Sequence, residues 1–182
     1  MTETDVVEII SYLQGRGVRL WVDGGWGVDA LLGEQTRDHA DLDLAVELVD
    51  SDLYEQAVAE AGFEFLYYDP ANDDSNGRHL NWVVKDDRGR EIDVHLVDTS
   101  TTTMAPDGEL VHGGIPYPVG SLTATGVVAG REVPCGTAQF QMASRTGYEI
   151  ADTDIHDIAA LHRRFGLPIP SEYDELIDPG TL

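Results

Sequence analysis

Basic side chains are scarce in this sequence of 182 residues. It has 11 Lys and Arg against 34 Asp and Glu, which gives a formal net charge of −23, and Lys85 is the only lysine. A surface of this charge repels nucleic-acid backbones, whose binding needs many Lys and Arg contacts. The composition therefore argues against polymeric DNA or RNA as a partner. Two explanations of the excess acid stay open: solubility in a high-salt cytoplasm, or attraction of a cationic small molecule.

Cysteine and long apolar runs are also scarce. Cys135 is the only cysteine, which excludes an internal disulfide, and no motif around it suggests a nucleophile, so we expect a buried, inert thiol. No apolar stretch approaches the roughly 20 residues that span a membrane. The acidic N-terminus does not resemble a signal peptide. We therefore expect a cytoplasmic protein with no membrane partner.

Hydrophobic periodicity and the positions of glycine predict an α+β fold. We expect a mixed, twisted sheet flanked by helices, rather than a doubly wound parallel sheet. The helices are expected at 4–16, with Thr4 as the N-cap, and at 26–32, 53–61, 138–146 and 153–165. The strands are expected at 18–22, 42–47, 63–67, 79–84, 91–97, 126–129 and 132–133. The acidic tail after Pro168 is expected to be mobile or loosely draped.

Two carboxylates spaced two residues apart lie at the start of the strand predicted at 42–47. Asp41 and Asp43 would point to the same face of this strand, roughly 7 Å apart. They would repel each other unless a cation lay between them. In the strand at 91–97, apolar and polar side chains alternate, and Asp93 is on the polar face. Three such carboxylates are hard oxygen ligands of the kind that suit Mg²⁺.

Gly24 and Gly25 form a tight turn before the helix predicted at 26–32. Their backbone N–H groups could approach a phosphate, and the positive end of the helix would point at the same place. A Gly-Gly pair alone is usually only a turn, and an Asp-x-Asp pair is common on solvated strands. The turn, the pair and the later aspartate together indicate phosphoryl or nucleotidyl transfer.

These motifs resemble those of a known family. Residues 22–33, followed by Gln35, Thr36, Arg37 and the pattern His39-x-Asp41-x-Asp43, closely resemble the small lincosamide and aminoglycoside-2″ nucleotidyltransferases. The resemblance is nearest to the lincosamide branch. Further matches lie at 92–95, where the family has its third acid, and at 133–135, 138–139, 147–148 and 153–158. The resemblance therefore covers about residues 18–160.

The resemblance implies a nucleotidyltransferase fold and an adenylyltransferase that uses ATP and two Mg²⁺ ions. It would move AMP to a hydroxyl group of a small cationic, lincosamide-like antibiotic and release pyrophosphate. Carried over by position, Asp41 and Asp43 would hold the metals, and Asp93 would share one and act as general base. Arg37 and His39 would lie near the triphosphate. Residues 1–98 would form the catalytic core, and residues 99–182 would pack on it and contribute to the acceptor groove. A homodimer stays open as the assembly.

Other residues in the motifs have structural explanations that are at least as good. Trp26 is expected in the core rather than stacked on adenine, and Asp29 is expected to bind neighbouring backbone. Asp154 and Asp157 suit the positive end of the last helix before any ligand. For His95, two interpretations are equally good: it orients Asp93 or touches the substrate, or it has a plain structural role.

Three rival functions remain open at this point. The acceptor could be an aminoglycoside, as in the aminoglycoside-2″ branch of the family. The protein could instead transfer AMP to a protein partner. It could also be a non-catalytic module that only binds nucleotide, although the presence of all three aspartates argues against this.

Overall fold

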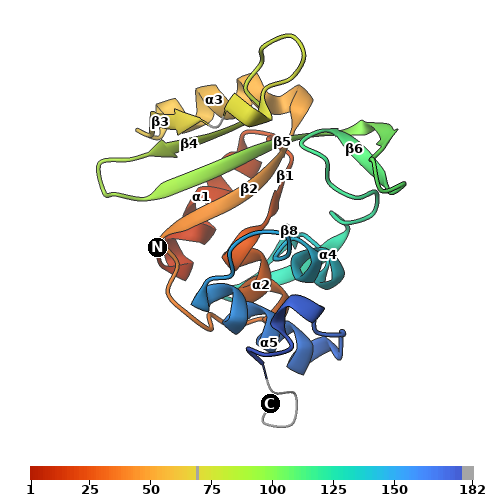
Figure 1. Ribbon diagram of the computed structural model, residues 1–182. Helices are drawn as coiled ribbons and strands as arrows, with labels where there is room; N and C mark the ends of the chain where they lie inside the picture. Colours follow the sequence, from red (N-terminus) through yellow and green to blue (C-terminus); the bar gives the residue numbers. More distant parts are fainter. Residues whose placement is uncertain (69, 178–182) are drawn as a thin grey trace.

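The fold is built on one mixed sheet of eight strands, in the part of the chain that the computed structural model describes, residues 1–68 and 70–177. The strand order is β3-β4-β5-β2-β1-β8-β7, and β6 pairs with β5 outside this path (Figure 1). The strands are β1 (Leu20–Val22), β2 (Asp41–Glu47), β3 (Glu64–Tyr68), β4 (Asn81–Lys85), β5 (Glu91–Met104), β6 (Leu110–Gly114), β7 (Ala124–Val128) and β8 (Arg131–Cys135). Parallel pairs, β2 with β5 and β1 with β8, occur beside antiparallel ones.

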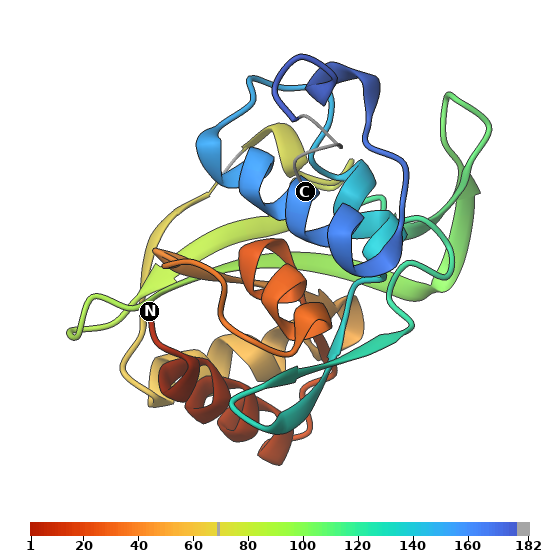
Figure 2. The same cartoon turned by 90° about the horizontal axis from the view of Figure 1, so that it is seen from below.

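Helices pack on both sides of this sheet. Figure 2 shows α1 and α3 on one side, with α4 and α5 on the other. The helices are α1 (Glu3–Gly15), α2 (Gly24–Leu32), α3 (Ser51–Glu60), α4 (Ala138–Ala143) and α5 (Asp152–Phe165), with short 3-10 turns η1 (Leu48–Asp50), η2 (Pro70–Asn72) and η3 (Ser171–Tyr173). This arrangement is α+β and confirms the predicted fold class. Among the described residues, no helix combines the length and apolar character needed to cross a bilayer.

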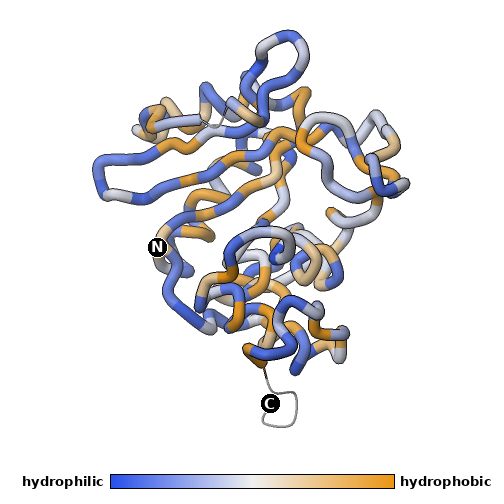
Figure 3. Tube along the Cα trace, in the orientation of Figure 1, coloured by the Kyte–Doolittle hydropathy of each residue, from blue (hydrophilic) through white to orange (hydrophobic). Residues whose placement is uncertain are grey.

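The central strands have one apolar and one polar face. Leu42 and Leu44 of β2 and Ile92 and Val94 of β5 are fully buried, and they belong to the core that α1 and α3 cover. The alternation is visible along these strands in Figure 3. Because successive side chains of a strand point to opposite faces, the intervening aspartates lie on the side away from this core.

The helix ends follow local capping chemistry. α2 ends at Gly33, which has φ +80°, so the predicted glycine stop is confirmed. The predicted N-cap Thr4 is wrong, because the N-cap of α1 is Thr2. Asp5 accepts hydrogen bonds from the backbone and side chain of Thr2, and its own N–H donates to the Thr2 hydroxyl. This reciprocal capping box satisfies two free N–H groups and fixes the start two residues earlier.

The C-terminal half is part of the same sheet. β5 runs through the proposed boundary at residues 98 and 99, and β8 pairs in parallel with β1 through Val22 and Cys135. Cys135 is fully buried, and burial raises the pKa of its thiol to about 12, which agrees with the predicted inert role. The strand β6 was not predicted, because its sequence contains two glycines and little apolar alternation.

The expectation of a loosely draped tail after Pro168 is wrong for the residues described. Tyr173 is fully buried and Ile177 is 4% exposed, and both pack with Val28 and the apolar face of α5. The Tyr173 hydroxyl donates a hydrogen bond to the carbonyl of Arg145. Two apolar anchors therefore hold this acidic segment against the helices. The end of the predicted tail, residues 178–182, lies outside the described residues.

Candidate active site

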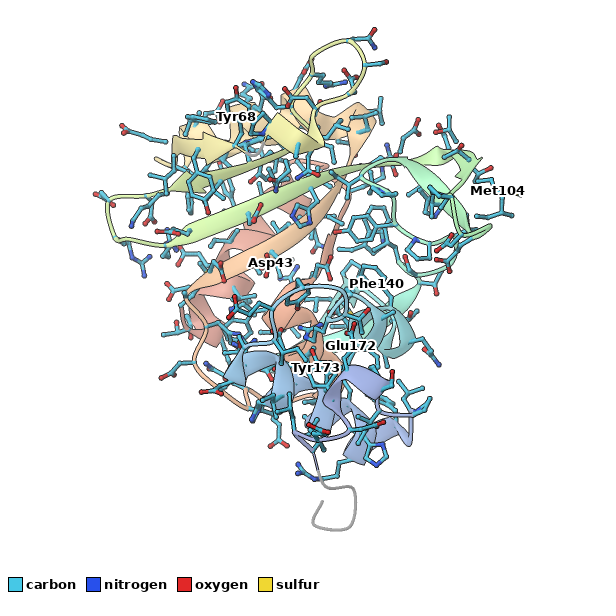
Figure 4. The ribbon with its side chains drawn as sticks, viewed as in Figure 1. Asp43, Tyr68, Met104, Phe140, Glu172 and Tyr173 are labelled. Carbon is cyan, nitrogen blue, oxygen red and sulfur yellow. The ribbon has the colours of Figure 1, made fainter. Side chains whose placement is uncertain are left out.

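Two aspartates lie directly opposite each other on neighbouring strands. Asp43 of β2 is in register with Asp93 of β5, and Asp41 opens β2 on the same face. Figure 4 shows Asp43 on the side of the sheet that faces the C-terminal helices. Burial raises the pKa of Asp43 well above its usual value, and the charges of Asp41, Asp23 and Asp93 raise it further. The predicted convergence of the three carboxylates on one sheet face is therefore present.

Asp93 is held by neighbours on its own sheet. Asn81 of β4 donates from Nδ2 to Asp93 Oδ1 at 2.5 Å, and His95 Nε2 lies 3.6 Å from the same oxygen. Burial raises the pKa of Asp93, while His95 and Asn81 oppose this shift. No hydrogen bond among the described residues engages Oδ2. That oxygen is therefore available to a ligand or a proton.

His95 connects to a buried hydrogen-bonded chain. Its Nδ1 lies 3.0 Å from the Tyr117 hydroxyl oxygen, and that hydroxyl donates to Asp23 Oδ2 at 2.6 Å. Burial and the charge of Asp23 raise the pKa of Tyr117 well above its usual value, so the phenol keeps its proton. Because that single proton is directed at Asp23, Nδ1 of His95 must be the donor to Tyr117. His95 Nε2 therefore lies on the side of Asp93, where it can form an ion pair with the carboxylate only when the ring carries a second proton.

The glycine turn lies against the carboxylates. Asp23 is the N-cap of α2 and accepts a hydrogen bond from the Gly24 N–H at 2.8 Å. A Cβ added to Gly24, whose φ is +57°, would lie 1.9 Å from Asp43 Oδ2. A Cβ added to Gly25 would lie 2.5 Å from Arg37 Nη2 and from His39 Nδ1. Both positions need glycine because side chains from β2 and the preceding loop approach the backbone closely.

Beside the turn is a cavity of about 260 Å³ between α2, α4 and α5. Its wall includes two guanidinium groups that share one buried carboxylate. Asp157 accepts from Arg37 Nε at 2.8 Å and Nη2 at 2.9 Å, and from Arg145 Nη2 at 2.9 Å. The trio carries one net positive charge, which can attract a phosphate, although the same wall also includes Asp23, Asp43 and Asp154. The cavity is lined by Asp23, Gly24, Gly25, Arg37, Asp43, His95, Ser144, Arg145, Tyr148, Asp154 and Asp157.

His39 lies behind Arg37 rather than in the open cavity. It is 5% exposed, its Nδ1 lies 3.0 Å from Arg37 Nη1, and its Nε2 lies 2.6 Å from Asp29 Oδ2. Its ring packs 4.4 Å from that of Trp26, which is 1% exposed and confirms the predicted core role of this tryptophan. Within residues 1–68 and 70–177, the Asp29 carboxylate binds the side chains of His39 and Thr36, and not the neighbouring backbone that was predicted.

The polar residues around the carboxylates were mostly not predicted. Asp157 was expected to serve the helix start, yet its carboxylate is 1% exposed and is held by two arginines. Gln141 donates to Asp23 Oδ1 at 2.7 Å and accepts from Arg145 Nη1 at 2.9 Å. For Asp23, its place immediately before Gly24 was a usable signal, since Asp is a favoured N-cap. The other contacts join segments far apart in the chain and have no local signal.

The donor set fits a divalent cation. Asp41, Asp43 and Asp93 provide oxygen ligands on one face, and their mutual repulsion is the condition that a bound cation relieves. Within residues 1–68 and 70–177, no group of three or more His, Cys, Asp or Glu is drawn together closely enough to hold a metal in this conformation. Side-chain rotation would be needed for all three to share one ion.

Comparisons with known proteins identify the family. A family model described as aminoglycoside-2″-adenylyltransferase matches residues 5–161. A lincosamide resistance protein of Staphylococcus haemolyticus is 26% identical over 170 residues, covering 88% of this chain and 94% of that protein. A 2″-aminoglycoside nucleotidyltransferase of Escherichia coli is 33% identical over 84 residues, covering 37% of this chain and 48% of that protein.

Solved structures share the fold. The crystal structure of the lincosamide antibiotic adenylyltransferase LnuA with bound lincomycin superposes with a TM-score of 0.70 at 24% identity, covering 88% of this chain and 96% of that one. ANT(2″)-Ia in complex with adenylyl-2″-tobramycin gives a TM-score of 0.59 at 20% identity, covering 95% and 83%. The protein belongs to the aminoglycoside-2″-adenylyltransferase family of nucleotidyltransferases.

Proposed function

We propose that this protein transfers AMP from ATP to a hydroxyl group of a small cationic antibiotic of the lincosamide type and releases pyrophosphate. The observation that carries the proposal is the pairing of Asp43 with Asp93 directly beside the Gly24 turn. The lincosamide acceptor is favoured over an aminoglycoside because the likeness to the lincosamide resistance protein extends over 170 residues, against 84 for the aminoglycoside enzymes.

The nucleotide would bind between the turn and the C-terminal helices. The N–H groups at the start of α2 and the positive end of that helix face the cavity, where they favour phosphate. Arg37 and Arg145 add the unbalanced positive charge described above. His39 supports this arrangement by packing against Arg37. Together these groups offset locally the strongly negative charge of the whole protein.

Asp41, Asp43 and Asp93 would hold Mg²⁺, and we propose two ions. When bound, the metal would neutralise the carboxylates and polarise the phosphate oxygens. Asp93 would accept the proton of the acceptor hydroxyl, with Asn81 fixing its orientation through a hydrogen bond to Oδ1. The acceptor oxygen would then bond to the α-phosphorus as the bond from that phosphorus to the pyrophosphate oxygen breaks. The proton stays on Asp93 until it passes to solvent.

The acceptor would enter on the other side of Asp93, where the open sheet face of β4 and β5 meets the portion formed by residues 99–182. A surface with 34 acidic residues favours a cation there. The same charge disfavours polymeric nucleic acid, as the composition indicated. We propose that the protein acts on a small molecule in the cytoplasm, and its assembly as monomer or homodimer is left to measurement.

Mass spectrometry tests this function directly. The purified protein is incubated with ATP and Mg²⁺ and, separately, with lincomycin, clindamycin, kanamycin or tobramycin. We expect lincomycin or clindamycin to gain the mass of one adenylyl group, with pyrophosphate formed in equal amount. Modification of the aminoglycosides alone would support the second candidate, which the family model favours. No adduct with any acceptor would contradict both.

A further inference from the structure

One row of side chains crosses the sheet from the active site to its edge. Asp43 of β2 lies opposite Asp93 of β5, Asp93 lies opposite Val83 of β4, and Val83 lies opposite Tyr67 of β3. Residues directly opposite each other in a sheet share a face. Tyr67 is therefore on the same face as the aspartates. Because neighbouring strands are about 4.8 Å apart, it lies two strands, or roughly 10 Å, from Asp93.

An irregularity in β3 brings Tyr67 to this face. The register of β3 on β4 shifts between Phe65, which pairs with Val84, and Tyr67, which pairs with Val83. Leu66 is the extra residue of this bulge. With regular pairing, Leu66 would lie opposite Val83, and Tyr67 would turn to the opposite face. Bulges occur often beside active sites, where they redirect a side chain.

The redirected ring is exposed and lies on the sheet face that carries the carboxylates. Tyr67 is 55% exposed and belongs to β3, which lies at the edge of the sheet. Its pKa is raised by partial burial and then by the charges of Asp93, Glu91, Asp41 and Asp43. Lys85, on the same face, is tied to Glu91 at 2.7 Å. Within the described part of the chain, arginines lie over the rings of Tyr12, Phe63 and Phe165, and none lies over Tyr67.

We infer that Tyr67 forms a subsite for the acceptor, in which its ring receives an alkylated ammonium group. The inference rests on the proposed function and adds to it the kind of acceptor. A cation with alkyl substituents is attracted both by the face of an aromatic ring and by nearby carboxylates. The acceptor would span the row, with its reacting hydroxyl at Asp93 and its ammonium roughly 10 Å away at Tyr67. In the proposed arrangement the nucleotide would lie on the opposite side of Asp93 and would not contact this ring.

The test compares Tyr67→Ala with Tyr68→Ala. Tyr68 is the adjacent residue, is 39% exposed, and has its ring centre 3.8 Å from that of His79. It pairs with Trp82 of β4, so it lies on the sheet face opposite to Tyr67. It lies at the outer edge of the fold, away from Asp43 (Figure 4). For each variant, calorimetry gives the Kd for lincomycin without ATP, and AMP transfer gives the KM for lincomycin, the KM for ATP and kcat. Thermal unfolding confirms that each variant is folded.

We expect Tyr67→Ala to raise the Kd and KM for lincomycin about three- to thirtyfold, as loss of a cation–ring contact would. The KM for ATP and kcat should change less than about twofold. Tyr68→Ala should leave all four values near wild type, and Tyr67→Phe, which keeps the ring, should stay within a few-fold. Tetramethylammonium should compete with lincomycin more strongly than sodium at equal ionic strength, and this difference should disappear in Tyr67→Ala.

Several results would overturn the inference. An unchanged Kd in Tyr67→Ala would show that the ring does not contact the acceptor, and an equal effect of Tyr68→Ala would point to a general effect on β3. A loss of ATP affinity in Tyr67→Ala would place the nucleotide, not the acceptor, at this ring. Wild-type protein that binds lincomycin without transferring AMP would contradict the proposed function alone, and the Kd comparison would still decide the subsite. Absence of lincomycin binding would contradict both.

Discussion

Replacing Gly24 with alanine tests whether the turn and the carboxylates work as one unit. The added Cβ would lie 1.9 Å from Asp43 Oδ2, 2.5 Å from its Cγ and 3.0 Å from its Cβ. The Asp43 side chain must therefore leave its place opposite Asp93. A displacement of about 1 Å in a catalytic arrangement can cost a hundredfold in rate, so we predict that kcat for AMP transfer falls at least about a hundredfold.

The effect of backbone strain can be measured separately, because Gly33, the C-cap of α2, has the same left-handed conformation as Gly24. Gly24 has φ +57° and Gly33 has φ +80°, and no atom of the described residues lies within 4 Å of a Cβ built on Gly33. In both positions, alanine should cost about 1–2 kcal/mol for its left-handed conformation. In a protein of this size, each kcal/mol corresponds to about 2–4 °C in Tm. We therefore expect a loss of Tm in both variants, larger in Gly24→Ala because Asp43 must also move, and loss of activity only in Gly24→Ala.

The assay measures pyrophosphate release with lincomycin and ATP, beside thermal unfolding of both variants. Near-native turnover in Gly24→Ala would refute the reasoning, because Asp43 would then be dispensable or free to move without loss. Equal loss of activity in Gly33→Ala would also refute it, since the cause would then be strain in α2 rather than contact with Asp43.

Three further predictions concern the charged groups. Asp43→Asn should abolish transfer yet raise Tm at pH 7 in EDTA. Folding raises the pKa of Asp43, so the ionised carboxylate destabilises the folded protein at pH values above that pKa. The gain in Tm should therefore shrink as the pH falls towards 4, where the carboxylate becomes protonated in both states. A gain that does not change with pH would contradict this. Tyr117→Phe should lower kcat about tenfold and leave the KM for ATP unchanged, because it removes one hydrogen bond to His95 and one to Asp23. A kcat equal to that of wild type would contradict the positioning role of Tyr117. Asp157→Asn should destabilise the protein by about 3–5 kcal/mol in urea unfolding, because the buried guanidinium of Arg145 and the partly buried one of Arg37 lose their partner. A loss below about 1 kcal/mol would be inconsistent with the ion pairs described.

The parts of the site that follow from local periodicity could be predicted from sequence. Asp41 and Asp43 share a face because a strand alternates every second residue, and the same alternation places Asp93 on the polar face of β5. Gly33 ends α2 because a glycine adopts its positive φ without strain. In each case the physical cause lies within a few residues of the position concerned.

The supporting residues could not be predicted, because their partners are distant in the chain. Tyr117 and Gln141 reach Asp23 from 94 and 118 residues away, and Asp157 reaches Arg37 from 120 residues away. Their chemical character, an ordinary phenol, amide or carboxylate, gives no sign of such contacts. The segment after Pro168 was predicted wrongly for a different reason. Its acidic composition indicated a loose tail, but two apolar residues, Tyr173 and Ile177, pack it against the helices.

The account depends most on Asp93 as the group that takes the proton from the acceptor. The most direct test is the turnover of Asp93→Asn with saturating lincomycin, ATP and Mg²⁺, measured as adenylylated product by mass spectrometry. Loss of a general base costs about 10²–10⁴-fold, and loss of a metal ligand adds to this, so we predict a decrease of at least a thousandfold with Tm at or above that of wild type. Turnover within tenfold of wild type would contradict the central claim.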